Sequence, residues 1–412
     1  MSSEWEEYIF EDCLETLIDY RGKTPEKAER GIPLITAKIV KNGKIEKPSE
    51  FIAESDYASW MRRGIPQYGD IIMTTEAPLG EVAQLGNGKF ALAQRIITLR
   101  GKKDVLDNAF LLYLIQTKEM QNKLKARATG TTVLGIKQSE LRKIPVQLPP
   151  ISFQKTIVSI LKALDDRIHL LRETNATLEA IAQALFKSWF VDFDPVHAKV
   201  EGRAPEGMDA DTAALFPDSF KESELGMIPE GWKVSRVESH IELAYGKALK
   251  QENRIAGSII VMGSNGQIGV HNELLVKGPG IVIGRKGNPG TVEWVDSDFF
   301  PIDTTFYLRQ KDDIPLAFWL YTFSALSLPS LAADSAVPGL NRNFVYNCAF
   351  SHPPLDILLV FNAFFETIRA NIYSNTKRIE TLSILRDTLI PRLISGKLRL
   401  PEFAESASGT VL

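Results

Sequence analysis

Several short motifs contain residue types that could bind phosphate or take part in catalysis. Each of them lacks a residue that the corresponding chemistry requires. Gly22-Lys23-Thr24 resembles the end of a phosphate-binding loop, but Leu17 stands where such a loop needs its first glycine. The segment 263–269 follows a strand-like run as a dinucleotide-binding loop does, yet Asn265 replaces the middle glycine, which predicts a turn instead. The tetrapeptide 352–355 lacks the residues that flank Pro-Pro in amino-methyltransferases. These motifs therefore predict no catalytic residue.

The histidines and cysteines have no spacing suited to a metal or a disulfide. The five histidines are scattered, without the i, i+4 pair of a zinc-binding helix. Cys13 and Cys348 lie far apart in apolar surroundings and outside any Cys-x-x-Cys pattern. The sequence therefore predicts no metal site, and two inert core thiols in a cytosolic protein.

The chain repeats itself at a constant shift of 204 residues between Gly135 and Ile394, so that Gly135 corresponds to Gly339. The double prolines at 149–150 and 353–354 also correspond, and each pair precedes a long helical pattern. A fixed-period repeat predicts duplicated structural units. We expect two similar globular modules, each followed by a long helix.

Heptad spacing predicts a narrow apolar seam on both long helices. The ten seam positions of the first helix are Ile157, Leu161, Leu164, Ile168, Leu171, Asn175, Leu178, Ala182, Leu185 and Trp189. Eight of the ten counterparts are apolar: Phe361, Phe365, Ile368, Ile372, Asn375, Ile379, Leu382, Arg386, Leu389 and Leu393. A helix over 153–190 would be roughly 57 Å long. We expect the two helices to pack on each other, the alternative being ordinary core helices of a larger domain.

Length and charge set further bounds. A chain of 412 residues with 44% apolar residues can bury more than one core. It has no apolar run long enough to span a membrane, and the acidic start is unlike a signal peptide, so a cytoplasmic location is expected. Ten acidic and three basic residues give 191–230 a net charge of −7, which leaves +4 on the rest against the total of −3. This balance is compatible with a nucleic-acid partner and marks an acidic connector.

Within the modules, short β-rich runs alternate with glycine turns, which favours a mixed or mostly antiparallel sheet. Two segments match between the halves: 69–80 matches 280–290 with one gap, and 90–100 matches 299–309. The loops differ, because Arg285 and Lys286 stand where the first copy has Thr75 and Glu76. Similar frames with different polar loops are expected if each module binds a different target.

The central and terminal segments resemble the specificity subunit of type I restriction-modification enzymes. The central run comprises Trp189-Phe-Val-Asp-Phe-Asp-Pro-Val, Lys199-Val-Glu-Gly202, Leu215-Phe-Pro-Asp-Ser-Phe220 and Glu224-Leu-Gly-Met-Ile-Pro-Glu-Gly-Trp232. The module and helix ends 149–154 and 389–397 resemble the same family, and 263–266, 284–287 and 301–305 resemble one common type of its target recognition domain. The resemblance covers Trp5 to Lys397.

This resemblance implies an α+β fold with two similar α/β target recognition domains in a pseudo-two-fold arrangement, joined by two long antiparallel coiled-coil helices. It implies a non-catalytic subunit that binds a bipartite site on double-stranded DNA and scaffolds methyltransferase (modification) and restriction (endonuclease and translocase) subunits. S-adenosylmethionine, ATP and magnesium would belong to those partner subunits, with no cofactor in this chain. The expected domains are 1–150 and 232–354 for recognition, 151–190 and 355–396 for the helices, 191–231 for the connector and 397–412 for a tail.

Candidate DNA contacts follow from the loops of this resemblance. Phosphate contacts position a protein on DNA, whereas side chains that reach base edges specify the sequence. In the second module the candidates are Arg285, Lys286, Asn288, Ser264, Asn265, Asn341 and Arg342. In the first module they are Thr75, Glu76, Gln94, Arg95, Lys137 and Gln138, with Lys38, Lys41, Arg62 and Arg63 for phosphates.

Two other functions stay open on sequence grounds. The chain could be a coiled-coil protein-protein adaptor without DNA specificity, or a free-standing DNA-binding protein without enzyme partners. A steep salt dependence of binding to random DNA would exclude the adaptor, because it reports contacts to several phosphates. A stable complex with a methyltransferase subunit would exclude the free-standing protein.

Asn175 and Asn375 are polar residues at seam positions. If the helices run antiparallel, one register pairs Asn175 with Asn375 and apolar residues with each other. Sliding either helix by a heptad would bury each amide against hydrocarbon, at a cost of about 1–3 kcal/mol for each unsatisfied group. We therefore predict that this pair specifies the register, as a buried asparagine does in other coiled coils.

Overall fold

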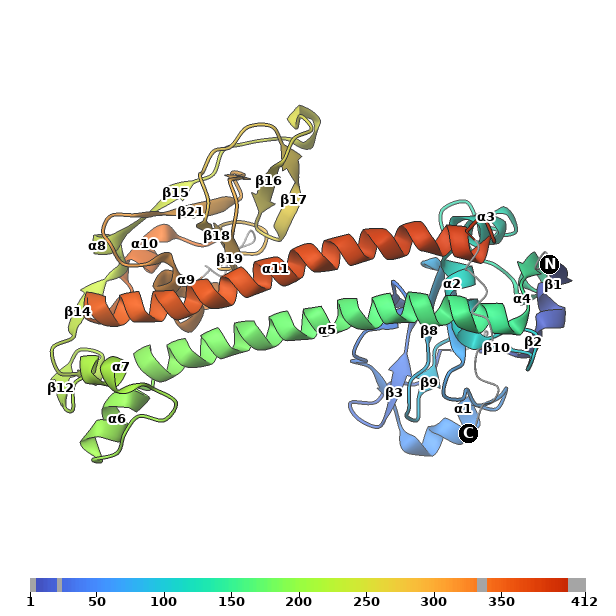
Figure 1. Cartoon of the computed structure of the whole chain (residues 1–412), viewed down its shortest axis with the longest axis horizontal. Coiled ribbons are helices and arrows are strands. Elements are labelled where there is room, and N and C mark those ends of the chain that lie inside the picture. The colour runs from blue at the N-terminus through green and yellow to red at the C-terminus, as the bar shows by residue number, and fades with distance from the viewer. Residues whose placement is uncertain (1–4, 21–23, 332–338, 399–412) are drawn as a thin grey trace, which may run out of the picture. The chain divides into compact units, whose positions relative to one another are not determined.

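The computed structural model describes residues 5–20, 24–331 and 339–398 (Figure 1). Of the expected tail, residues 399–412 lie outside the described residues. The chain forms two compact units, the first from residues up to 170 and from 378 onward, the second from 171–377. Each unit contains one globular module and one half of each long helix, α5 (Ile151–Phe190) and α11 (Leu355–Ile394).

Module 1, in the first unit, is built on a four-stranded antiparallel sheet in the order β2-β10-β7-β8. Its strands are β1 (Glu6–Ile9), β2 (Leu14–Asp19), β3 (Ile32–Ile35), β4 (Val40–Lys41), β5 (Lys44–Ile45), β6 (Phe51–Ile52), β7 (Ile71–Thr75), β8 (Leu79–Gln84), β9 (Ala91–Leu92), β10 (Ile96–Gly101) and β11 (Pro145–Leu148). Its helices are α1 (Tyr57–Trp60), α2 (Asn108–Gln116), α3 (Lys118–Ala126) and α4 (Gln138–Leu141), with 3-10 turns η1 (Phe10–Cys13), η2 (Ala37–Ile39) and η3 (Glu54–Asp56).

The strand β7 is buried on both faces, which explains its continuous apolar run. On one face Met73 joins a core with α2 and with the adjoining ends of α5 and α11. On the other face Ile72 packs with the smaller sheet β6-β3-β9, in which β3 and β9 are parallel. The module is therefore a mixed α+β structure with two cores.

Module 2, in the second unit, repeats the sheet in the order β15-β21-β18-β19. Its strands are β14 (Lys233–Arg236), β15 (Ile241–Tyr245), β16 (Ile259–Gly263), β17 (Gly266–His271), β18 (Gly280–Gly284), β19 (Val292–Val295), β20 (Phe299–Pro301), β21 (Thr305–Gln310) and β22 (Ala349–His352). Its helices are α8 (Val237–His240), α9 (Leu316–Ala325) and α10 (Arg342–Asn347), with η4 (Gln251–Asn253) and η5 (Leu328–Leu331). The segment 263–269, expected to be a turn, spans the last residue of β16, the turn at 264–265 and the first four residues of β17 in the β16-β17 hairpin.

The strand register confirms that the two modules share one skeleton. Thr74 of β7 pairs with Ile96 of β10, and Gly284 of β18 pairs with Thr305 of β21 at the equivalent place. The loop that follows β7 is therefore the structural counterpart of the loop that follows β18. The α+β fold class expected from the sequence is present, with two modules and two long helices.

The acidic connector is more ordered than a linker. It forms α6 (Asp194–Val200), α7 (Ala210–Leu215) and the hairpin of β12 (Phe220–Ser223) with β13 (Gly226–Pro229). Val196, Phe216 and Ile228 are buried in the core of the second unit. These apolar side chains fix the connector to module 2. Their spacing in the sequence is irregular, so it shows no helical or strand period.

In each unit, half of α5 packs along half of α11. In the first unit Ile157 and Leu161, near the start of α5, share a core with Ile390 and Leu393, near the end of α11. In the second unit the order is reversed, because Phe186 near the end of α5 lies 5.8 Å from Phe361 near the start of α11, measured between ring centroids. The helices therefore run antiparallel in both units.

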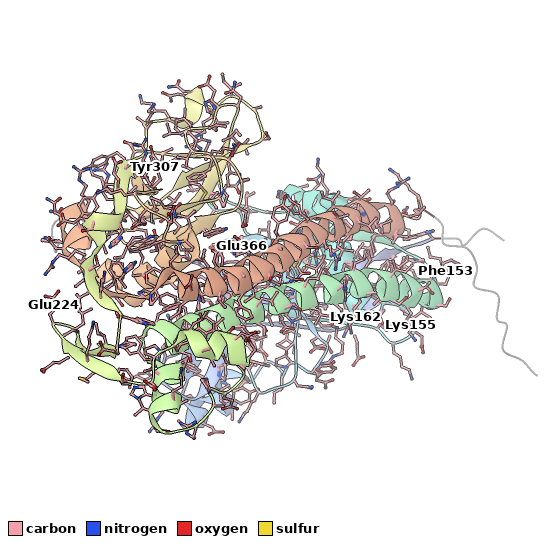
Figure 2. The ribbon with its side chains drawn as sticks, turned by 60° about the vertical axis from the view of Figure 1, so that its left-hand side comes forward. Phe153, Lys155, Lys162, Glu224, Tyr307 and Glu366 are labelled. Atoms are coloured by element: carbon pink, nitrogen blue, oxygen red, sulfur yellow. The ribbon has the colours of Figure 1, made fainter. Side chains whose placement is uncertain are left out.

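The exposed faces of the two helices carry charged residues together with apolar ones such as Ile384, which is 68% exposed. Lys155 and Lys162 on α5 and Glu366 on α11 are exposed (Figure 2). None of the helices in the described ranges is long and apolar enough to cross a membrane. Burial raises the pKa of the free Cys13 thiol to about 12, which keeps it protonated at neutral pH.

The two seam asparagines contact each other in the second unit. Asn375 donates from Nδ2 to Asn175 Oδ1 at 2.9 Å, and Asn175 Nδ2 lies 3.4 Å from Thr376 Oγ1. Both side chains are half-buried. The amide pair derived from the repeat is present in this structure, and its role in selecting the register remains a prediction.

We expect Asn175→Leu to lower the free energy of unfolding by about 1–3 kcal/mol, because the amide of Asn375 loses its partner. The double replacement Asn175→Leu with Asn375→Leu should restore most of this loss, since no half-buried amide is left unpaired. Chemical denaturation of the full chain measures both effects, and exposed Asn371→Leu serves as the control. Additive losses in the double variant would contradict the coupling of the two amides.

Candidate nucleic-acid interface

In both modules a loop at the end of a central strand is held between two other segments. In module 2 the Arg285 N–H donates to the Thr304 carbonyl at 2.9 Å, and the Leu340 N–H donates to the Arg285 carbonyl at 2.9 Å. Lys286 also forms a β-bridge with Gly339. The sheet and the segment before α10 thus fix the backbone of this loop.

Module 1 has the same arrangement. The Thr75 N–H donates to the Arg95 carbonyl at 2.9 Å, and the Ile136 N–H donates to the Thr75 carbonyl at 3.0 Å. Glu76 forms the β-bridge with Gly135. The structure therefore brings three separate candidate loops of each module together, and it aligns Thr75 with Arg285 and Glu76 with Lys286.

The candidate loops of module 1 line a polar cleft of about 410 Å³. Five of the six predicted base contacts border it: Thr75, Glu76, Gln94, Arg95 and Lys137. Gln138, the sixth, begins α4. Arg95 Nη2 lies 3.7 Å from Glu76 Oε1, and both side chains are about half exposed, at 49% and 44%. The cleft thus offers a carboxylate, an amide and two cations to a ligand.

Not every predicted residue of module 1 presents a side chain to the cleft. Thr75 is 2% exposed, and its hydroxyl lies 3.3 Å from the Arg95 carbonyl, to which it donates. This threonine therefore positions the loop. The phosphate candidates do not border the cleft. Lys38 and Arg62 are exposed, Lys41 pairs with Glu46 at 3.1 Å, and Arg63 donates to the Asp19 carbonyl at 2.6 Å.

The candidate loops of module 2 gather two arginines around one ring. The guanidinium carbons of Arg285 and Arg342 lie 5.3 and 5.2 Å from the ring centroid of Tyr245, at the end of β15. Sequence reasoning missed Tyr245, because an aromatic residue in a strand is usually a core residue. Its 51% exposure is a property of the folded sheet edge.

The remaining candidate residues of module 2 differ in how far their side chains are exposed. Asn265 and Asn288 are exposed, whereas Ser264 is buried close to the Arg285 loop. A Cβ atom added at Gly287 would lie 3.2 Å from Ser264 Oγ. The side chain of Asn341 accepts the Asn343 N–H at 2.9 Å and so caps α10. Asn265 and Asn288 remain accessible to a ligand, while Ser264 and Asn341 support the loops.

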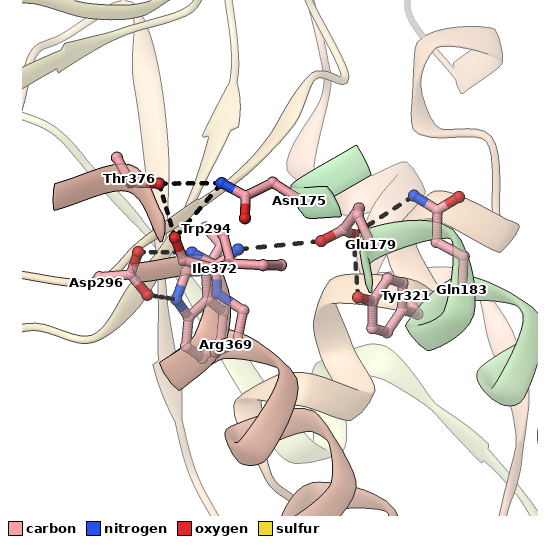
Figure 3. A network of polar contacts seen from close by, with 9 residues as sticks. All are labelled: Asn175, Glu179, Gln183, Trp294, Asp296, Tyr321, Arg369, Ile372 and Thr376. Carbon is pink, nitrogen blue, oxygen red and sulfur yellow. Dashed lines mark hydrogen bonds and ion pairs between the residues drawn. The ribbon is translucent and has the colours of Figure 1, made fainter. Parts of the chain in front are cut away.

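A chain of polar contacts attaches module 2 to the helix pair (Figure 3). The Tyr321 hydroxyl of α9 donates to Glu179 of α5 at 3.0 Å, and Arg369 of α11 lies 3.9 Å from the same carboxylate. Arg369 also donates to Asp296 at 2.5 Å, and its guanidinium carbon lies 5.7 Å from the ring centroid of Trp294. Burial and then Glu179 raise the pKa of Tyr321, so its hydroxyl remains a donor.

Module 1 has an equivalent attachment within its own unit. The Tyr113 hydroxyl of α2 donates to Asp165 of α5 at 2.7 Å, and Arg386 of α11 donates to the same carboxylate at 2.8 Å. Burial and then the bond to Asp165 raise the pKa of Tyr113. In both units a tyrosine, a carboxylate and an arginine therefore join one module to both helices.

One cluster outside these loops resembles the side chains of a hydrolytic triad. Ser235 Oγ lies 2.6 Å from His240 Nε2, and His240 Nδ1 contacts Asp312. The carboxylate of Asp312 also accepts the Ile314 N–H at 3.2 Å, and the His240 ring packs on Phe350 with 5.4 Å between centroids. These contacts tie α8 to the segment before α9, which is a structural role.

Comparison with known proteins agrees with this geometry. Residues 2–180 match the family model of the type I restriction modification DNA specificity domain. The specificity subunit of the type I restriction enzyme MjaIX of Methanocaldococcus jannaschii is 26% identical, over 90% of this chain and 88% of that relative. The HindI specificity subunit of Haemophilus influenzae is 22% identical, over 80% of this chain and 86% of that relative.

A solved structure shows the same fold. The S subunit of a type I restriction-modification system from M. genitalium superimposes with a TM-score of 0.57 at 18% sequence identity. The alignment covers 95% of this chain and 96% of that structure. Residues 2–180 thus match the DNA specificity domain of type I restriction modification, and most of the chain is similar to the specificity subunits of type I restriction enzymes.

Proposed function

We propose that this chain is the non-catalytic DNA-recognition subunit of a type I restriction-modification complex, in which each module reads one half of a bipartite site. The proposal is supported by the different polar side chains that the two modules present from the same strand framework. Module 1 presents Glu76 beside Arg95 in a polar cleft, whereas module 2 presents Arg285 and Arg342 around Tyr245. Two rigid frames with different polar loops suit two different base sequences.

The proposed partners are double-stranded DNA, the methyltransferase subunits and the restriction subunits. S-adenosylmethionine, ATP and magnesium would act in those partner subunits. A surface of the second unit supports a protein partner, because Val191, Leu225 and Met227 are exposed by 45%, 45% and 57%. Val191 and Leu225 border an apolar pocket of about 230 Å³ that also includes Phe186 and Phe190.

The test of this function is DNA binding by the full chain at several salt concentrations, together with mapping of methylated adenines in cells that contain the chain and its methyltransferase partner. We expect a steep decrease of affinity for random DNA with salt, since each neutralised phosphate adds about −0.9 to the log–log slope. We also expect methylation at a bipartite sequence. A flat salt dependence would favour the adaptor function, and DNA binding without a stable methyltransferase complex would favour the free-standing protein.

A further inference from the structure

Tyr245 is a platform for two cations that come from separate segments. Arg285 follows β18 and Arg342 begins α10, yet both guanidinium carbons lie within 5.3 Å of the Tyr245 ring centroid. These distances are within the ~6 Å range of a cation–π interaction. Phe306, the cross-strand neighbour of Tyr245, supports the ring with 5.0 Å between the centroids.

The orientation of Arg285 is fixed by a second contact. Its Nε and Nη2 donate to the carbonyl oxygen of Asp303 at 3.1 and 2.5 Å. An arginine has five N–H donors, so the Nη1 group and one Nη2 hydrogen remain available for a second acceptor pair. Since the ring and the carbonyl together restrain the guanidinium plane, little rotamer freedom is lost when a ligand binds.

The platform concentrates positive charge. Arg285, Lys286 and Arg342 form no ion pair with any carboxylate among the residues described, a set that omits 332–338. The planar guanidinium group of an arginine binds best to an acceptor that presents two oxygen or nitrogen atoms in one plane. In the DNA major groove guanine offers O6 and N7 in this arrangement, and arginine is the side chain that most often reads them.

Module 1 lacks the platform. The strand register aligns Tyr245 with Asp19, because Tyr245 pairs with Phe306 as Asp19 pairs with Ile97. The counterpart of Arg285 is the buried Thr75, and the 204-residue repeat places Gln138 at the position of Arg342. The difference between the modules is therefore an aromatic ring with two arginines in one and small or polar side chains in the other.

We propose that Tyr245 positions Arg285 and Arg342 to read guanine, so that the half-site of module 2 contains G·C base pairs at the positions these two side chains reach. This inference rests on the proposed function and adds the base that one module prefers. Arg285 and Arg342 contact the base edges, and Tyr245 acts through them as a positioning residue.

The experiment selects binding sites for the full chain, in complex with its methyltransferase partner, from a randomised duplex DNA library. Competition binding at one salt concentration then compares the wild type with Tyr245→Phe, Tyr245→Leu and Arg285→Lys. We expect Tyr245→Phe to keep the wild-type preference. Tyr245→Leu and Arg285→Lys should each lose roughly ten-fold or more of the preference for G·C, the size expected of one bidentate base contact.

Binding to random DNA distinguishes base reading from phosphate contact and from misfolding. Arg285→Lys keeps the charge, so affinity for random DNA and its salt dependence should stay at the wild-type level. Arg309→Lys is the matched control: Arg309 also lies over a tyrosine, 5.1 Å from the Tyr307 centroid, but outside the candidate loops and beside Glu242 at 3.6 Å. This control should keep the full preference.

The inference would be overturned, while the proposed function stands, by a wild-type half-site for module 2 without a G·C pair or by an unchanged preference in Tyr245→Leu and Arg285→Lys. A uniform loss of affinity for all sequences in Arg285→Lys would assign the arginine to a phosphate and also overturn it. A wild-type complex that selects no sequence at all would instead contradict the proposed function.

Discussion

Replacing module 1, residues 1–150, by the corresponding module of a related chain is expected to change one half of the methylated DNA site completely and to leave the other half unchanged. The physical reason is that the cleft of module 1 and the platform of module 2 share no residue, and each lies within its own unit. Mapping of methylated adenines in cells that contain the chimaera and the partner subunits measures the result.

The junction of this chimaera needs care, because α11 completes the core of module 1. Ile390, Leu393 and Ile394 pack with Phe110 and Leu161 in that core. The donor module should therefore carry similar apolar residues against the end of α11, and thermal unfolding should verify that the chimaera folds. The reciprocal exchange of residues 232–354 is the control and should alter only the other half-site. A change of both half-sites by either exchange would count against two independent readers.

Asp70→Asn is expected to destabilise the first unit by about 3–5 kcal/mol, the usual effect of removing one partner from a buried ion pair. Asp70 is 1% exposed, and its two carboxylate oxygens accept from Arg100 Nε and Nη2 at 2.7 and 2.8 Å. The bond to Asp70 raises the pKa of Arg100, which stays charged and would lose its main partner. Hydrogen exchange of the amides in β7 and β10 reports the loss locally, without assuming that both units unfold together.

An exposed pair in the same module provides the comparison. Glu119 and Lys123 lie 2.7 Å apart on α3, with side chains that are 69% and 32% exposed. Glu119→Gln should change the same exchange rates little, since exposed pairs contribute about 0.2–1 kcal/mol. Equal effects of Asp70→Asn and Glu119→Gln would show that burial does not decide the strength of the Asp70–Arg100 pair.

The sequence determined the features that depend on local periodicity and on the repeat. Heptad spacing predicts the long helices, since apolar residues such as Ile157 and Leu161 recur at the period that one helix face requires. The 204-residue shift relates the two modules. Combined with an antiparallel register of the two helices, it predicts the contact between Asn175 and Asn375. The match between 69–80 and 280–290 also predicts that the loop after β7 and the loop after β18 are structurally equivalent. These inferences succeed because helix period, strand runs and turns are set by neighbouring residues.

Only the tertiary structure decided which side chains are presented to a ligand. Thr75 and Arg285 occupy equivalent positions in the sheets of the two modules. Thr75 is buried, whereas the guanidinium group of Arg285 lies over the exposed ring of Tyr245. Tyr245 carries no signal in the sequence, because its role depends on strand register and on two loops that approach it from elsewhere in the chain. The connector likewise joins the core through Phe216, which has no periodic pattern around it. Burial and side-chain proximity depend on how distant segments pack, which residue spacing along the chain does not report.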